Sequence, residues 1–147
     1  MNAPYKLPRP SPVSGPRIGT GPWYNAKGVK VADSVADLHS ANNKLGKENS
    51  LTEKGATVNG RGDTPNTHDM LTGSNADGTL ATGTGDVTCG NWTSTATDGH
   101  ARLGHFDKQG GGEAPTSWNS AHLSNGCTQA NLVATGGAGL FYCFATN

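Results

Sequence analysis

Apolar residues occur along this chain in short runs that are separated by polar and glycine-rich stretches. Two valines alternate with other residues over 28–32, which predicts a short strand. Three apolar residues recur at helical spacing over 33–42, so a short helix is predicted there with Asp33 as its cap. A second short strand or turn is predicted over 51–58, where the turn dipeptide Asn-Gly follows.

From residue 60 onward the pattern is dominated by turns. Asp-Gly pairs and the Gly110-Gly111-Gly112 run divide the chain into short apolar pieces, which lie at 70–71, 103–106, 132–133 and 140–144. Strands of a few residues that are joined by long loops are typical of an α+β or mostly irregular domain. We therefore predict an α+β fold with short strands, long loops and little helix.

The composition limits how large a core the chain can build. Hydrophobic residues make up 33% of the 147 residues, and 22 residues are glycine. Burial of apolar surface, at roughly 25 cal/mol per Å², has to offset the entropy lost when the chain orders. A single domain of this length therefore needs help from cross-links, bound ions or neighbouring subunits. Seven aromatic residues are expected to form most of the core, namely Trp23, Tyr24, Trp92, Trp118, Phe141, Tyr142 and Phe144.

The ends and the charge of the chain narrow the class of protein. Residues 1–22 contain six prolines and are predicted to form an extended N-terminal arm. Eleven basic residues balance eleven acidic ones, which argues against nucleic-acid or membrane partners. No run of 18 apolar residues occurs, and no secretory leader is visible at the start. Because the cysteines favour an extracellular setting, we interpret the chain as a processed or trimmed form of a secreted protein.

The sequence has three cysteines, Cys89, Cys127 and Cys143. An odd number means that one of them is unpaired within this chain or pairs elsewhere. The sequence by itself permits three single pairings. No spacing matches a zinc ribbon, and no Cys-x-x-Cys redox pair is present.

The order of aromatic and cysteine motifs in the second half of the chain is characteristic. It runs through Cys89-Gly90-Asn91-Trp92, Trp118-Asn119-Ser120, Cys127 and Phe141-Tyr142-Cys143-Phe144. This order resembles the C-terminal half of C-type-lectin-like domains, and the Cys-x-x-Trp start is similar to the endostatin branch and its bacterial relatives. The resemblance implies a C-type-lectin-like domain over 23–147 that lacks its first third, with Cys89 and Trp92 on a strand.

The resemblance also assigns the cysteines. It implies a Cys89–Cys127 disulfide and leaves Cys143 without its usual partner on an N-terminal helix. We expect Cys143 to pair with another chain, or the exposed face to be covered by the proline-rich arm of a neighbour. The alternative is a buried free cysteine that packs as a small hydrophobic residue.

Metal and cofactor binding are not predicted. Calcium prefers six to eight oxygen ligands, and Ser120 stands where the Trp-Asn-Asp motif of sugar-binding lectins carries a carboxylate. The usual calcium site is therefore not expected, although calcium is the one cofactor that the resemblance leaves open. His100 and His105 would have to converge across a bend, and no histidine spacing matches a zinc motif. Loop histidines held by hydrogen bonds are expected instead.

The sequence favours a binding or structural protein over an enzyme, because no nucleophile elbow or catalytic carboxylate pair occurs. We predict an extracellular module that binds a carbohydrate or protein ligand through the long loop 99–125. Its candidate ligand-binding residues are Asp107, Glu113, Trp118, Asn119 and His122. The alternative is a structural subunit of an extracellular assembly or filament, a homo-oligomer or a complex with a partner chain, in which neighbours complete the domain through Cys143 and the N-terminal arm.

Overall fold

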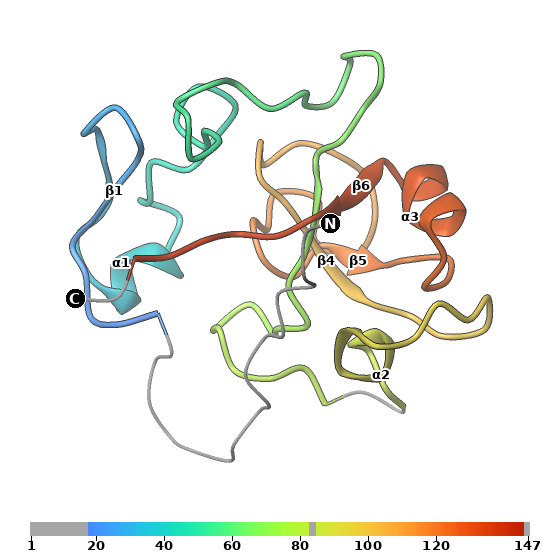
Figure 1. The fold of residues 1–147 in the computed structure, drawn as a ribbon. Helices are drawn as coiled ribbons and strands as arrows, with labels where there is room; N and C mark the ends of the chain where they lie inside the picture. Colours follow the sequence, from blue (N-terminus) through green and yellow to red (C-terminus); the bar gives the residue numbers. More distant parts are fainter. Residues whose placement is uncertain (1–17, 83–84, 146–147) are drawn as a thin grey trace, which may run out of the picture.

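A computed structural model describes residues 18–82 and 85–145, so most of the arm predicted over 1–22 lies outside the described residues. The predicted α+β class with little helix is confirmed (Figure 1). None of the helices within the described ranges is long and apolar enough to cross a membrane. The elements in chain order are β1 (Trp23–Tyr24), β2 (Lys30–Ala32), α1 (Val35–Leu38), β3 (Asp69–Leu71), α2 (Cys89–Trp92), β4 (Arg102–His105), β5 (His122–Leu123), α3 (Gln129–Thr135) and β6 (Gly137–Leu140).

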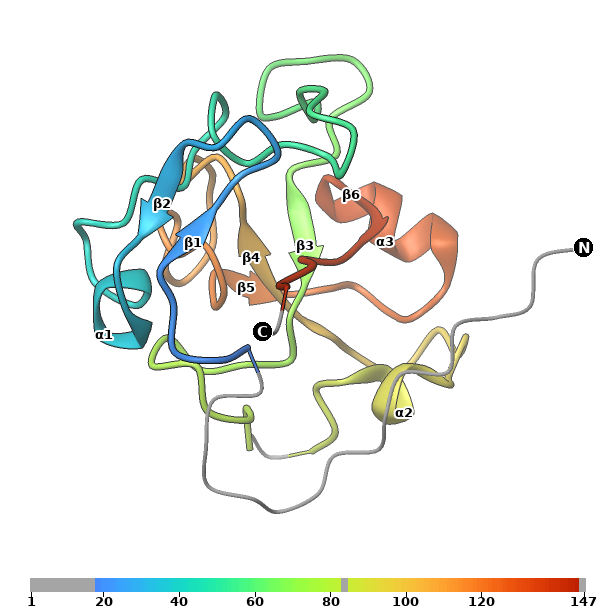
Figure 2. The same cartoon turned by 60° about the vertical axis from the view of Figure 1, so that its left-hand side comes forward.

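The larger sheet has four strands in the order β5-β4-β3-β6 (Figure 2). Strand β4 runs antiparallel to both of its neighbours, β3 and β5, whereas β6 runs parallel to β3. Asp69 lies opposite His105, and Leu103 lies opposite both Leu71 and His122. Directly opposed residues project from the same face of a sheet, and residues two apart on a strand share a face. This register brings Asp69, His105 and His122 to one face.

A smaller sheet pairs β1 with β2, and α1 follows directly. The strand predicted over 28–32 is therefore confirmed as β2. The predicted cap of the helix is wrong by one residue: Ser34 is the N-cap, and its hydroxyl accepts a hydrogen bond from the Asp37 amide at 3.2 Å. Asp33 instead donates its backbone N–H to the Asp37 carboxylate at 2.8 Å. This reciprocal arrangement resembles a capping box.

Two hydrophobic clusters form the core. The first gathers around Trp23, Leu38 and Trp118, and the second around the disulfide with Leu103 and Ala101. The seven aromatic residues were expected to form most of the core, but two of them, Tyr24 and Phe141, are 58% and 44% exposed. Phe106 is fully buried in their place. Trp118 packs edge-on against Tyr142, and Trp23 packs edge-on against Phe144.

Three local predictions need correction. Cys89–Trp92 is a short helical turn and not a strand, because Cys89, Gly90 and Asn91 all have positive φ. The apolar piece at 132–133 belongs to helix α3, which begins after the N-cap Thr128 and ends at Gly136 with φ 104°. The last strand, β6, ends at Leu140, so most of the piece predicted over 140–144 lies beyond it.

The disulfide implied by the resemblance is present. Cys89 and Cys127 are bonded, with their Cα atoms 5.6 Å apart. Cys143 is free and exposed, so the alternative of a buried thiol packing as a hydrophobic residue is wrong. This disulfide joins α2 to the loop that precedes α3.

Candidate functional site

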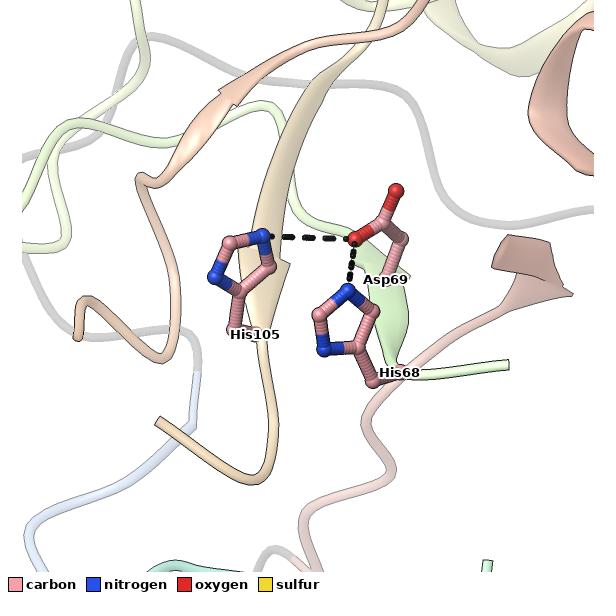
Figure 3. A group of neighbouring side chains, drawn as sticks. All are labelled: His68, Asp69 and His105. Carbon is pink, nitrogen blue, oxygen red and sulfur yellow. Dashed lines mark ion pairs between the residues drawn. The ribbon is translucent and has the colours of Figure 1, made fainter. Parts of the chain in front are cut away.

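Three of the five histidines converge on a single carboxylate. His68 immediately precedes β3, Asp69 is the first residue of β3, His105 ends β4 and His122 begins β5. The Asp69 Oδ1 atom lies 3.2 Å from His68 Nε2, 3.4 Å from His105 Nε2 and 3.5 Å from His122 Nε2. Figure 3 shows His68 and His105 directed at this oxygen. We call these four residues the histidine cluster.

The histidine cluster is an interior feature. His68, Asp69 and His105 are buried, and the side chain of His122 retains 19% exposure. The His68 and His105 rings stack with centroids 4.3 Å apart and planes differing by 10°. The His122 ring lies 5.0 Å from that of His105. Four ionisable side chains are therefore packed together where little water reaches them.

The Nδ1 atom of each of these three histidines contacts a hydrogen-bond acceptor. His68 Nδ1 contacts the Asp107 carboxylate at 3.1 Å, His105 Nδ1 contacts the Pro115 carbonyl at 2.7 Å, and His122 Nδ1 contacts the Leu123 carbonyl at 3.0 Å. A carbonyl or carboxylate oxygen requires a donor, so all three Nδ1 atoms carry the proton. In a neutral ring the other nitrogen, Nε2, then bears a lone pair that faces Asp69.

The centre of the histidine cluster lacks hydrogen bonds. Both carboxylate oxygens of Asp69 and the Nε2 atom of His105 are buried without a hydrogen-bond partner. A buried polar atom left in this way costs about 1–3 kcal/mol. Among the described residues, His68, Asp69 and His105 also offer one donor atom each, all within 4.8 Å of one another, a spacing at which one cation can be shared.

Burial and the shared carboxylate move two pKa values in opposite directions. Removal from water lowers the pKa of His105, and the neighbouring His68 and His122 lower it further. Interaction with Asp69 raises the pKa of His122 above its ordinary value. His105 is therefore a neutral imidazole near pH 7, and His122 is the ring that keeps a proton to higher pH.

A cavity of about 400 Å³ opens beside the histidine cluster. This volume lies in the usual range for small-ligand pockets. Seven of its ten lining residues have polar side chains, and the lining comprises Arg61, Asn66, His68, His105, Gly111, Gly112, His122, Leu123, Asn125 and Thr135. The cavity thus connects the exposed edge of the histidine cluster with the surface.

Glycines let the backbone approach the rings closely. A methyl group on Gly110 would overlap the His105 ring, and one on Gly112 would lie 2.9 Å from His122 Cβ. Gly110 and Gly112 both have positive φ, at 153° and 91°. The glycine run that the sequence marks as a turn therefore packs against two of the three rings.

The structure separates the predicted site residues into two groups. Asp107 and His122 lie at the site. The Asp107 carboxylate accepts hydrogen bonds from His68 Nδ1 and from the Arg61 amide, and His122, a member of the histidine cluster, lines the cavity. Glu113 is on the surface and pairs with Arg102 at 2.9 Å. Asp107 is itself buried, so it orients His68 through a hydrogen bond and does not face solvent.

Trp118 and Asn119 lie in the interior. Trp118 belongs to the first hydrophobic cluster, and its ring contacts Tyr142 and Phe144. Asn119 is buried and donates through Nδ2 to the Asn75 carbonyl at 2.8 Å. Neither residue lines the cavity.

The sequence offered His68, Asp69 and His105 as metal-ligand candidates, but they were not selected as site residues because no histidine spacing matches a zinc motif. The available signal was the placement of His68-Asp69 at the start of an apolar piece and of His105 at the end of another, which antiparallel pairing brings together. Comparisons of the chain with protein-family models, with curated proteins and with solved structures found no match.

Proposed function

We propose that this chain is an extracellular, non-catalytic binding module of the endostatin-like, C-type-lectin-like type, and that it holds a carbohydrate in the cavity beside the histidine cluster. The observation that carries the proposal is the polar lining of that cavity. Arg61, Asn66, Asn125 and Thr135 contribute a guanidinium, two amides and a hydroxyl to one concave surface. Sugar hydroxyls both donate and accept, so they match such a mixed set.

The lining also indicates how the ligand is held. Within the described part of the chain, no Trp, Tyr or Phe borders this cavity. A sugar bound there is retained by hydrogen bonds and not by stacking on a large aromatic face. A volume of about 400 Å³ fits a ligand of one or two rings and excludes a long buried chain.

Two features support the extracellular, non-catalytic part of the proposal. A structural disulfide is typical of oxidising compartments. Among the described residues that line the cavity there is no carboxylate, so they supply no acidic pair.

Binding to a glycan array, followed by calorimetric titration with the glycans retained, tests the proposal. Arg61→Ala and Asn125→Ala should each weaken binding at least tenfold, because each removes a hydrogen-bonding group from the lining. Glu113→Gln is the matched control, since Glu113 lies on the same long loop outside the cavity and should leave affinity unchanged. Absence of glycan binding, or binding indifferent to both cavity variants, would contradict the proposal.

The exposed thiol of Cys143 favours a second candidate, a subunit of an extracellular assembly. It lies in the segment after β6, where its exposed thiol is accessible to another chain. In this case non-reducing electrophoresis should show disulfide-linked species that Cys143→Ser abolishes. Monomers at every protein concentration and a freely titratable thiol would exclude the covalent form of this assembly.

A further inference from the structure

We propose that the histidine cluster binds one divalent transition-metal ion of the zinc class. The donors are Asp69 Oδ1 and the Nε2 atoms of His68 and His105, which lie within 4.8 Å of one another. His122 Nε2, 3.5 Å from Asp69 Oδ1, lies beside them on the cavity side. The metal site is independent of the proposed sugar binding, because its donors are already gathered by the sheet register and need no cavity ligand.

The distances from Asp69 Oδ1 to the ring nitrogens suit four-coordinate geometry. Zinc bonds to histidine nitrogen and carboxylate oxygen are about 2.0–2.2 Å, so donors at the corners of a tetrahedron lie roughly 3.3–3.5 Å apart. Asp69 Oδ1 lies 3.2, 3.4 and 3.5 Å from the three Nε2 atoms. The His68 and His105 planes differ by only 10°, so we expect one ring to tilt as its lone pair turns to the metal.

The protonation pattern leaves a place for positive charge. All three Nδ1 atoms face acceptors and therefore hold their protons. Three Nε2 lone pairs then point at a buried carboxylate whose two oxygens have no hydrogen-bond partner. Four acceptors that face one another in a water-poor interior repel, and a cation among them removes the repulsion.

The surroundings of the histidines are those of metal ligands. A histidine that binds a metal almost always donates its second ring N–H to a carboxylate, a backbone carbonyl or a water. His68 donates to the Asp107 carboxylate, while His105 and His122 donate to backbone carbonyls. These contacts fix both the tautomer and the ring direction before any metal arrives.

The donor set selects the class of metal. Imidazole nitrogen suits zinc, copper, nickel and iron. Calcium requires six to eight oxygens, and the histidine cluster supplies one carboxylate. The inferred ion therefore differs from the calcium of sugar-binding lectins, and its site lies on β3, β4 and β5.

A histidine cluster held together by protons alone is the competing explanation. In that case a protonated His122 would neutralise Asp69 without any metal. Asp69→Asn separates the two explanations, because an amide is nearly isosteric with the carboxylate and can donate its N–H groups to Nε2 lone pairs. The variant should remain folded while losing the anionic donor.

The full chain, stripped with a chelator, is titrated with Zn²⁺ by calorimetry and with Co²⁺ by visible absorption. We expect one ion per chain and the intense visible bands of four-coordinate Co²⁺. Asp69→Asn and His105→Gln should each weaken Zn²⁺ affinity by at least 100-fold. His100→Gln is the matched control, since His100 is an exposed histidine outside the histidine cluster, and its affinity should stay within twofold of wild type.

Two results would overturn the proposal. One is a wild-type chain that takes up no Zn²⁺ at micromolar concentration. The other is an Asp69→Asn variant with native circular dichroism that binds Zn²⁺ as tightly as wild type; this readout holds even if His105→Gln fails to fold. Because the probe is the metal alone, these outcomes are separate from any failure of glycan binding.

Discussion

Asp69 and His105 lie directly opposite each other on β3 and β4, with Oδ1 and Nε2 3.4 Å apart, and neither atom has a hydrogen-bond partner. Both side chains are almost completely buried. The strand register thus enforces a contact between two acceptors that the metal-free protein does not satisfy. The loss in the free energy of unfolding that this contact causes should be measurable when one of these two acceptors is replaced.

We therefore expect Asp69→Asn to be at least as stable as wild type when both are free of metal. Replacing the carboxylate relieves an unsatisfied buried charge, an effect of about 1–3 kcal/mol. Zinc should make wild type the more stable of the two proteins, since a free Zn²⁺ concentration of 100 times the Kd stabilises wild type by about 2.7 kcal/mol. Urea unfolding with chelator and with Zn²⁺ measures both effects. A metal-free Asp69→Asn variant that is several kcal/mol less stable than wild type would show that the carboxylate is satisfied by protons.

The glycine loop offers a paired test of packing on the rings. Gly110→Ala places a methyl group against the His105 ring at a backbone φ of 153°, so it should cost about 1–3 kcal/mol and weaken Zn²⁺ binding. Gly111→Ala is the control, because nothing lies within 4 Å of the position its methyl group would occupy. Thermal unfolding of the two variants should differ clearly. Equal stabilities would mean that the loop moves away from His105 freely.

The sequence predicted the overall class and the positions of three strands because these follow from local patterns. Alternating valines located β2, and the apolar pieces at 70–71 and 103–106 coincide with parts of β3 and β4. The conformation of Cys89–Trp92 was not predictable in this way. All four residues there have positive φ, including the non-glycine residues Cys89, Asn91 and Trp92, and this conformation is unusual for residues with a side chain.

The histidine cluster was missed for a related reason. His68 and His105 are 37 positions apart in sequence, and their proximity depends on the pairing of β3 with β4. Metal motifs that can be recognised from spacing place their ligands on one element or one loop. Here His68 and Asp69 come from the start of β3 and His105 from the end of β4, so the register of the sheet carries the information.

Asp107 should increase the affinity of the metal site through its hydrogen bond with His68. Its carboxylate accepts from His68 Nδ1 at 3.1 Å, and loss of such a partner commonly weakens metal binding by about 10–100-fold. We expect Asp107→Asn to show this loss in a Zn²⁺ titration. The control is Glu113→Gln, which removes an exposed carboxylate from the same loop. Identical Zn²⁺ affinities for the two variants would place Asp107 outside the metal site.

The disulfide should supply a large share of the stability of a chain with so few apolar residues. Closing the loop between Cys89 and Cys127, which are 38 residues apart, is worth about 4 kcal/mol on the chain-entropy model. The double variant Cys89→Ser/Cys127→Ser should therefore be largely unfolded near 37 °C, as judged by near-ultraviolet circular dichroism. Cys143→Ser should melt like the wild type, since its thiol is exposed and free. A double variant as stable as Cys143→Ser would contradict this assignment.

Asp86 should make the turn before α2 sensitive to acid. Its carboxylate accepts hydrogen bonds from the Thr88 hydroxyl, from the Gly90 amide and from the Thr88 amide, and these lower its pKa below the ordinary value. A carboxylate whose pKa is lower in the folded state stabilises the fold above its unfolded pKa of about 3.9, and this stabilisation is lost as pH falls through the folded value. Asp86→Asn should accordingly be less stable than wild type at pH 7, and the difference should shrink below about pH 4. Urea unfolding of both proteins across this pH range measures the change. A difference that stayed constant down to pH 2 would assign the loss to altered turn geometry and not to the charge.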